Sequence, residues 1–154
     1  MNRVAIRSEE DPLPLQSESA ERFILTVLDR LEHDRWDLSV LFCRDTYIRT
    51  LNSRFRHKNE ATDVLSFPLG ETVEEAGEIR YLPGDIVISL ETLAENARYF
   101  KVPPEEELRR LLIHGILHLA GMDHATNADI EPMLRLQESL MAELAEERIP
   151  LRLV

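Results

Sequence analysis

Residues 103–124 read PPEEELRRLLIHGILHLAGMDH, and this segment predicts a helix that is buried in the core of the domain. Proline is tolerated in the first turn of a helix, and the three glutamates that follow suit the positive end of the helix dipole. Apart from the histidines, the residues from Leu111 to Leu119 are apolar or glycine. Gly121 can adopt the left-handed conformation that ends a helix. We therefore expect a buried helix that stops at Gly121.

Three histidines in this segment follow the pattern H-x3-H-x2-G-x2-H. His114 and His118 are four residues apart, so both imidazoles project from one face and can reach one metal at about 2.1 Å. A left-handed turn at Gly121 can bring His124 back to the same metal. Three imidazoles favour zinc, one ion per chain, with a fourth position open for water. The alternative is three ordinary histidines, but burying two imidazoles without partners would cost a few kcal/mol.

The spacing of the three histidines equals that of the metzincin zinc proteases, which carry a glutamate directly after the first histidine as general base. This chain has Gly115 there. The substitution disfavours peptide hydrolysis by the usual route and leaves the catalytic base unassigned. Asp123 has two interpretations: an acceptor that orients an imidazole, or a residue that simply favours the turn.

A cationic segment lies at residues 44–58, in a chain with 18 Lys and Arg against 29 Asp and Glu, net −11. Arg54, Arg56 and Lys58 stand at a predicted helix end and loop, where functional side chains are common. An arginine near the metal could bind a phosphate through paired hydrogen bonds. The acidic remainder argues against broad binding to nucleic acids or anionic membranes.

The rest of the chain alternates short apolar runs with amphipathic segments, which predicts one α+β domain over residues 1–154. We expect a small mixed sheet of about four strands packed with about five helices. The predicted strands are 3–7, 37–43, 62–67 and 84–89, and the predicted helices are 17–33, 45–55, 89–100, 103–120 and 127–147. Pro68 should stop the third strand, and the acidic stretch 70–78 should be a loop or an edge hairpin.

The composition also bears on the cellular compartment. Cys43 is the single cysteine, which excludes an internal disulfide and fits a reducing environment. The first residues, MNRVAIRSEEDPLPL, lack the apolar region of a secretory signal, and no apolar run approaches the roughly 18 residues of a membrane span. We therefore expect a cytoplasmic protein without a membrane partner.

Three blocks of the sequence resemble one known family. HGILHLAGMDH, residues 114–124, is similar to the H-G-x-L-H-L-x-G-x-D-H signature of the YbeY family of bacterial rRNA-maturation endoribonucleases. LNSRFRHKNEATDVLSFP, residues 51–68, resembles the family's second block, and GDIVIS, residues 84–89, a third. The blocks stand in the family's order with comparable spacing.

The resemblance implies a compact α+β fold with a metzincin-like metal helix and one zinc held by His114, His118 and His124. The family's functional arginine falls on Arg56. The resemblance also implies a role in maturation of the 16S rRNA 3′ end and in ribosome quality control. The implied partners are rRNA and ribosomal particles, with a ribosomal protein or a ribosome-assembly GTPase, and not DNA.

The resulting interpretation is a metal-dependent single-strand endoribonuclease. His114 and Arg56 are the expected catalytic residues, and Arg56 and Lys58 the expected substrate-binding residues. Either water or the RNA 2′-hydroxyl would attack the phosphorus. One alternative is a non-catalytic ribosome-assembly factor with a structural metal. The other is a zincin-type metalloprotease, which Gly115 disfavours.

Overall fold

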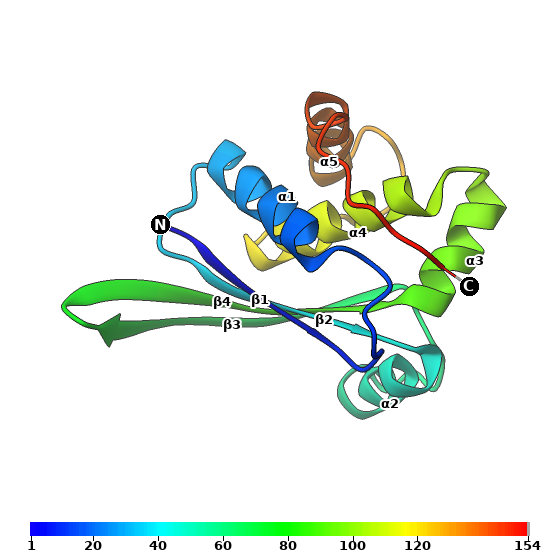
Figure 1. Ribbon diagram of the computed structural model, residues 1–154, viewed down its shortest axis with the longest axis horizontal. Helices are drawn as coiled ribbons and strands as arrows, with labels where there is room; N and C mark the ends of the chain where they lie inside the picture. The colour runs from blue at the N-terminus through cyan, green and yellow to red at the C-terminus, as the bar shows by residue number, and fades with distance from the viewer. Residues whose placement is uncertain (154) are drawn as a thin grey trace.

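The computed structural model describes residues 1–153, and the strands in this range form one mixed sheet (Figure 1). The strands are β1 (Arg3–Ser8), β2 (Asp37–Cys43), β3 (Val64–Glu75) and β4 (Glu78–Ser89). Their order across the sheet is β1-β2-β4-β3. β1 and β4 both pair with β2 in parallel, whereas β3 pairs with β4 antiparallel and leaves its other side free as a sheet edge. The predicted mixed sheet of four strands is therefore confirmed.

Helices cover both faces of the sheet. They are α1 (Ser17–Arg30), α2 (Asp45–Arg56), α3 (Leu90–Phe100), α4 (Pro104–Leu119) and α5 (Pro132–Glu143). α1 and α4 pack on one face, with α5 stacked outside α4, and α2 lies on the opposite face (Figure 1). This arrangement is the predicted α+β class. Within residues 1–153, no helix combines the length and apolar character needed to cross a bilayer.

α4 is the central helix of the core, as its sequence predicts. Leu112, Ile113 and Ile116 are completely buried. The helix ends at Leu119, and Gly121 follows with a φ of +95°, the conformation expected of a residue that turns the chain back. α4 also approaches the sheet closely at Gly115, where an added Cβ would lie 2.9 Å from Cδ1 of Ile86.

The prediction that Pro68 ends the third strand is wrong. β3 continues to Glu75 and pairs with β4 as a long hairpin, with a register shift between Pro68 and Glu71. Proline is tolerated here because β3 is the edge strand, so the nitrogen of Pro68 needs no partner on its open side. The acidic stretch 70–78 is thus the edge hairpin, one of its two predicted forms.

The last helix differs from its prediction, and Asp45 at the start of α2 makes contacts beyond its own helix. The helix expected at 127–147 is shorter, Pro132–Glu143, because Pro132 fixes its first turn and the preceding residues form turns. Asp45 begins α2, but its carboxylate accepts hydrogen bonds from the Ser89 and Thr92 hydroxyls, 2.6 Å each. Asp45 therefore ties α2 to the start of α3.

Candidate metal centre

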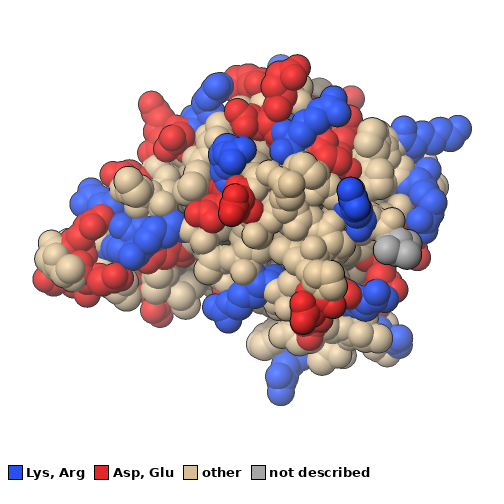
Figure 2. Space-filling view, in the orientation of Figure 1, with Lys and Arg blue, Asp and Glu red and all other residues tan. Residues whose placement is uncertain are grey.

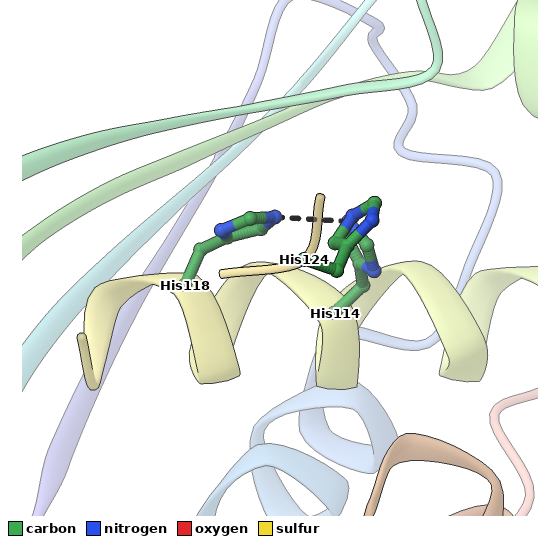
Figure 3. Close-up of side chains that lie close together, drawn as sticks. All are labelled: His114, His118 and His124. Atoms are coloured by element: carbon green, nitrogen blue, oxygen red, sulfur yellow. Dashed lines mark hydrogen bonds between the residues drawn. The ribbon is translucent and has the colours of Figure 1, made fainter. Parts of the chain in front are cut away.

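Three histidines meet on one side of α4. His114 and His118 project from neighbouring turns of the helix, and the turn at Gly121 returns His124 to them (Figure 3). One nitrogen from each ring lies within 4.8 Å of the other two. The structure therefore brings together all three histidines that the spacing grouped.

Each of the three rings is oriented by a hydrogen bond from its Nδ1 atom to an oxygen. The three pairs are His114 with Gln137 Oε1 at 2.7 Å, His118 with the Met122 carbonyl at 3.1 Å and His124 with the Thr126 carbonyl at 2.9 Å. Because a carbonyl oxygen can only accept, each Nδ1 carries the proton. The Nε2 lone pair of every ring is left available to bind a metal, the arrangement usual for metal-binding histidines.

The chemistry of this donor set fits a zinc ion. The Nε2 atoms of His114 and His118 are 3.1 Å apart. Two ligands of a tetrahedral zinc at about 2.1 Å would be separated by roughly 3.4 Å, a small adjustment. Burial lowers the pKa of both histidines, and for His118 the neighbouring His114 adds to this effect. Both rings are therefore neutral near pH 7, the form in which imidazole binds metals.

The cluster contains no carboxylate. Within residues 1–153, the group of ligand-type side chains consists of the three histidines alone. Gly115 faces the sheet, so a side chain at this position would point into the core, against Ile86. Asp123 accepts a hydrogen bond from the His124 backbone N–H at 2.8 Å, which matches its interpretation as a turn residue. Its carboxylate is 3.9 Å from His118 Nδ1.

Arg56 and Lys58 lie on the other side of the edge strand. Arg56 is the last residue of α2, and its Nη2 donates a 2.6 Å hydrogen bond to the Ser66 carbonyl in β3. The Ser66 hydroxyl donates in turn to the carbonyl of Gly115, the residue after His114, at 3.4 Å. Lys58 and Arg56 line a surface cavity of about 310 Å³. Arg56 is thus linked to the metal helix through one serine, whereas within residues 1–153 no such hydrogen-bonded link joins Lys58 to that helix.

Sequence analysis missed Gln137, the residue that orients His114. Gln137 is only 7% exposed and lies in α5, 23 residues after its partner. Its side chain also donates to Glu138, which turns the amide oxygen toward His114. The available signal was a glutamine between Met133 and Leu140 on the buried side of α5. Nothing in the local pattern pointed from that glutamine to a histidine on another helix.

Comparison with known proteins shows similarity to one protein family along nearly the whole chain. The family profile described as Endoribonuclease YbeY matches residues 5–145. A relative from Treponema denticola with that name is 47% identical over 137 residues, 88% of each chain, and one from Borreliella afzelii is 48% identical over 122 residues, 77% of this chain and 80% of the relative. The solution structure of TM1509 from Thermotoga maritima has a TM-score of 0.62 and 30% identity, and the match covers 93% of this chain and 90% of that one. The chain belongs to the Endoribonuclease YbeY family.

Proposed function

We propose that this chain is a metal-dependent endoribonuclease that cleaves single-stranded RNA during rRNA maturation. The observation that carries the proposal is the cluster of His114, His118 and His124, in which every Nδ1 is hydrogen-bonded to an oxygen and one nitrogen of each ring lies within 4.8 Å of the other two. Three protein ligands without a fourth are the arrangement of a catalytic zinc site. The family to which the chain belongs supports RNA as the substrate.

The three histidines would hold one zinc ion, with Gln137 fixing the orientation of His114. A zinc ion bound there supplies a Lewis acid that lowers the pKa of water and stabilises charge on a phosphate. The protein itself positions the three imidazoles: α4 places those of His114 and His118, and the turn at Gly121 places that of His124. Residue 115 supplies no base. A group other than residue 115 must therefore accept the proton of the attacking 2′-hydroxyl or water molecule.

Arg56 would bind the phosphate at or beside the cleavage point. Its guanidinium uses one nitrogen on the Ser66 carbonyl, and its other donors remain for a phosphate oxygen. Lys58 would bind a neighbouring phosphate as a point charge from the cavity that it shares with Arg56. In this proposal His114 acts through the metal and Arg56 acts directly on the substrate.

The proposed substrate is precursor rRNA at the 3′ end of 16S rRNA, within ribosomal particles in the bacterial cytoplasm. A role in ribosome quality control, with a ribosomal protein or a ribosome-assembly GTPase as partner, is part of the same proposal. Residues 1–154 would act as one catalytic domain. The support for this assignment is membership of the Endoribonuclease YbeY family.

The test measures bound metal and RNA cleavage on the same protein. We would determine the metal by mass spectrometry and incubate the protein with a 16S 3′-end precursor, alone and in ribosomal particles. We expect one zinc per chain, and we expect His114→Ala to lose both metal and cleavage. His33→Ala is the matched control, because His33 stacks on Trp36 and does not belong to the cluster, so this variant should lose neither.

Three other outcomes would reject the proposal. Bound metal without cleavage of free or ribosomal RNA would indicate an assembly factor with a structural metal. Cleavage of casein but not RNA would indicate a zincin-type protease. Equal cleavage by His114→Ala and the unsubstituted protein would show that cleavage does not depend on the histidine cluster. Where cleavage occurs, a 2′,3′-cyclic phosphate product would identify the 2′-hydroxyl as the attacking group.

A further inference from the structure

An aromatic pair lies uncovered at the end of α2, beside the edge strand. The rings of Phe55 and Phe67 meet edge to face, with centroids 5.5 Å apart and an interplanar angle of 71°. Phe55 leaves 55% of its surface exposed, although it is a large apolar side chain. We propose that this pair is a stacking platform for a base of single-stranded RNA beside the metal centre, an inference that rests on the proposed ribonuclease function.

Two guanidinium groups accompany the rings. The Arg54 guanidinium carbon is 6.0 Å from the Phe55 ring centroid, and that of Arg56 is 5.6 Å from the Phe67 centroid. Within residues 1–153, neither arginine forms an ion pair, and neither does Lys58 nearby. Three unpaired cations interleaved with aromatic rings are what proteins use to bind single strands: the rings stack on bases and the cations contact phosphates.

The position of Phe55 in its helix explains the exposure. α2 packs on the sheet through Ile48, and Asn52, which is also buried, donates to the Glu60 carbonyl in the following loop. Phe55 continues that side of the helix by one turn and meets Phe67 of β3, the edge strand. Within residues 1–153, no further strand pairs with β3 to cover the Phe55 ring. The Phe55 ring is therefore exposed because α2 extends one turn past the part of the helix that is buried.

The platform and the histidines are connected through a single residue of β3. Phe67 directly follows Ser66, whose carbonyl accepts from Arg56 and whose hydroxyl donates to the Gly115 carbonyl on α4. α2 and α4 lie on opposite faces of the sheet (Figure 1), so a bound strand would cross the β3 edge at Ser66. A short RNA would then stack one base on Phe55 and reach the histidines with a following phosphate.

The chain offers a contrasting exposed aromatic pair. Tyr99 and Phe100, at the end of α3, are 80% and 60% exposed and also meet edge to face. Within the described part of the chain, no guanidinium lies over either of these rings. Tyr99 is therefore a matched control for an exposed ring without the cations that would hold a nucleotide.

The experiment measures binding apart from cleavage. A fluorescently labelled single-stranded RNA of about ten nucleotides would be titrated with His114→Ala protein, which we expect not to cut it, and anisotropy recorded. Phe55→Leu, which keeps an apolar side chain but removes the aromatic face, should weaken binding about five- to 150-fold, the equivalent of ~1–3 kcal/mol per stacked base. Phe55→Trp should retain binding. Tyr99→Leu should bind as the parent does, and thermal melting would check that each variant is folded.

Unchanged affinity in Phe55→Leu, or an equal loss in Tyr99→Leu, would overturn the platform. The same substitutions made in the protein with intact histidines separate this inference from the proposed function. Cleavage that persists with unchanged KM in Phe55→Leu would reject the platform and leave the nuclease standing. Binding that depends on Phe55 in a protein that cleaves no RNA would reject the nuclease and leave the platform standing.

Discussion

Gly115 determines the chemistry available to the metal helix. It occupies the position at which metzincins carry their catalytic glutamate. In this structure a Cβ at residue 115 would lie 2.9, 3.0 and 3.1 Å from three side-chain carbons of Ile86. A side chain there would be directed into the sheet, against Ile86. The absence of a base at this position is therefore built into the packing of α4 on β4.

The close approach predicts that Gly115→Ala destabilises the protein. Replacing glycine by alanine within a helix favours folding by about 1 kcal/mol, but overpacking a core typically costs about 1–3 kcal/mol. Ile86 is completely buried and branched at Cβ, so it has little freedom to move. Because these two terms partly cancel, we expect a net loss of up to about 2 kcal/mol in the free energy of unfolding, measured by urea denaturation.

The matched control for this prediction is the double variant Gly115→Ala, Ile86→Val. Valine lacks the Cδ1 atom that stands 2.9 Å from the added methyl group. The alanine should therefore cost less in the Ile86→Val background than in the parent. An equal cost in both backgrounds, or a stabilised single variant, would show that the contact with Ile86 is not what excludes a side chain.

At the scale of the element, α5 completes the metal centre by supplying Gln137. Gln137→Leu removes the acceptor of the His114 Nδ1 proton and leaves that ring free to rotate. Loss of such a partner typically weakens metal binding about 10- to 100-fold. We expect this loss for zinc, measured by competition with a chromogenic chelator.

Two variants test whether the effect of Gln137→Leu is specific. Gln137→Glu keeps an oxygen acceptor and should bind zinc nearly as well as the parent. Gln16→Leu removes an exposed glutamine whose side chain accepts a hydrogen bond from Ser19, and it should leave the zinc affinity unchanged. Normal zinc affinity in Gln137→Leu would mean that α4 and its following turn orient the rings without α5.

The sheet depends on one carboxylate that joins three strands. Asp37 of β2 accepts hydrogen bonds from Arg3 of β1 and from Arg80 of β4, whose side chain is 5% exposed. Burial raises the pKa of Asp37, but the hydrogen bonds from the two arginines outweigh it and hold the pKa below its ordinary value. The charged form is therefore favoured in the folded protein.

This lowered pKa predicts a pH dependence of stability. The contribution of the Asp37 carboxylate to the free energy of unfolding is complete above the unfolded-state pKa of about 3.9. It is lost as the pH falls through the lower folded-state pKa. Asp37→Asn should reduce the free energy of unfolding by about 1–3 kcal/mol at pH 7, and the difference from the parent should narrow below about pH 4. Urea denaturation over this range checks it. Asp29→Asn, at an exposed carboxylate of α1, should change little, and a constant difference for Asp37→Asn would contradict the assignment.

The sequence predicts those parts of the fold and site that depend on neighbouring residues. The burial of α4, its end before Gly121 and the grouping of three histidines all follow from spacing within 22 residues. The extension of β3 past Pro68 depends on β3 being an edge strand, which is a property of the assembled sheet. Gln137 and the Arg56–Ser66 hydrogen bond likewise join separate elements, so no local pattern contains them.

On the scale of the whole molecule, charge is distributed unevenly around the edge strand. The far end of the β3–β4 hairpin carries Glu71, Glu74, Glu75 and Glu78, and Figure 2 shows acidic side chains around its tip. The opposite end of β3 lies beside the cations of residues 54–58. In a chain of net charge −11, this distribution repels a polyanion from most of the surface and leaves the α2 end of β3 as the favoured approach.

Such a confined cationic site predicts a small but definite salt dependence of RNA binding. If Arg54, Arg56 and Lys58 each neutralise one phosphate, the slope of log affinity against log salt should be about −2, since each contact on a single strand contributes about −0.7. Anisotropy titrations of His114→Ala protein at several KCl concentrations measure it. Lys58→Ala should make the slope shallower by about 0.7, because one contact is lost. Lys101→Ala, at the end of α3, should leave the slope unchanged because this lysine is remote from the edge strand. A slope near zero, or an equal change in both variants, would mean that RNA does not bind through the cations beside β3.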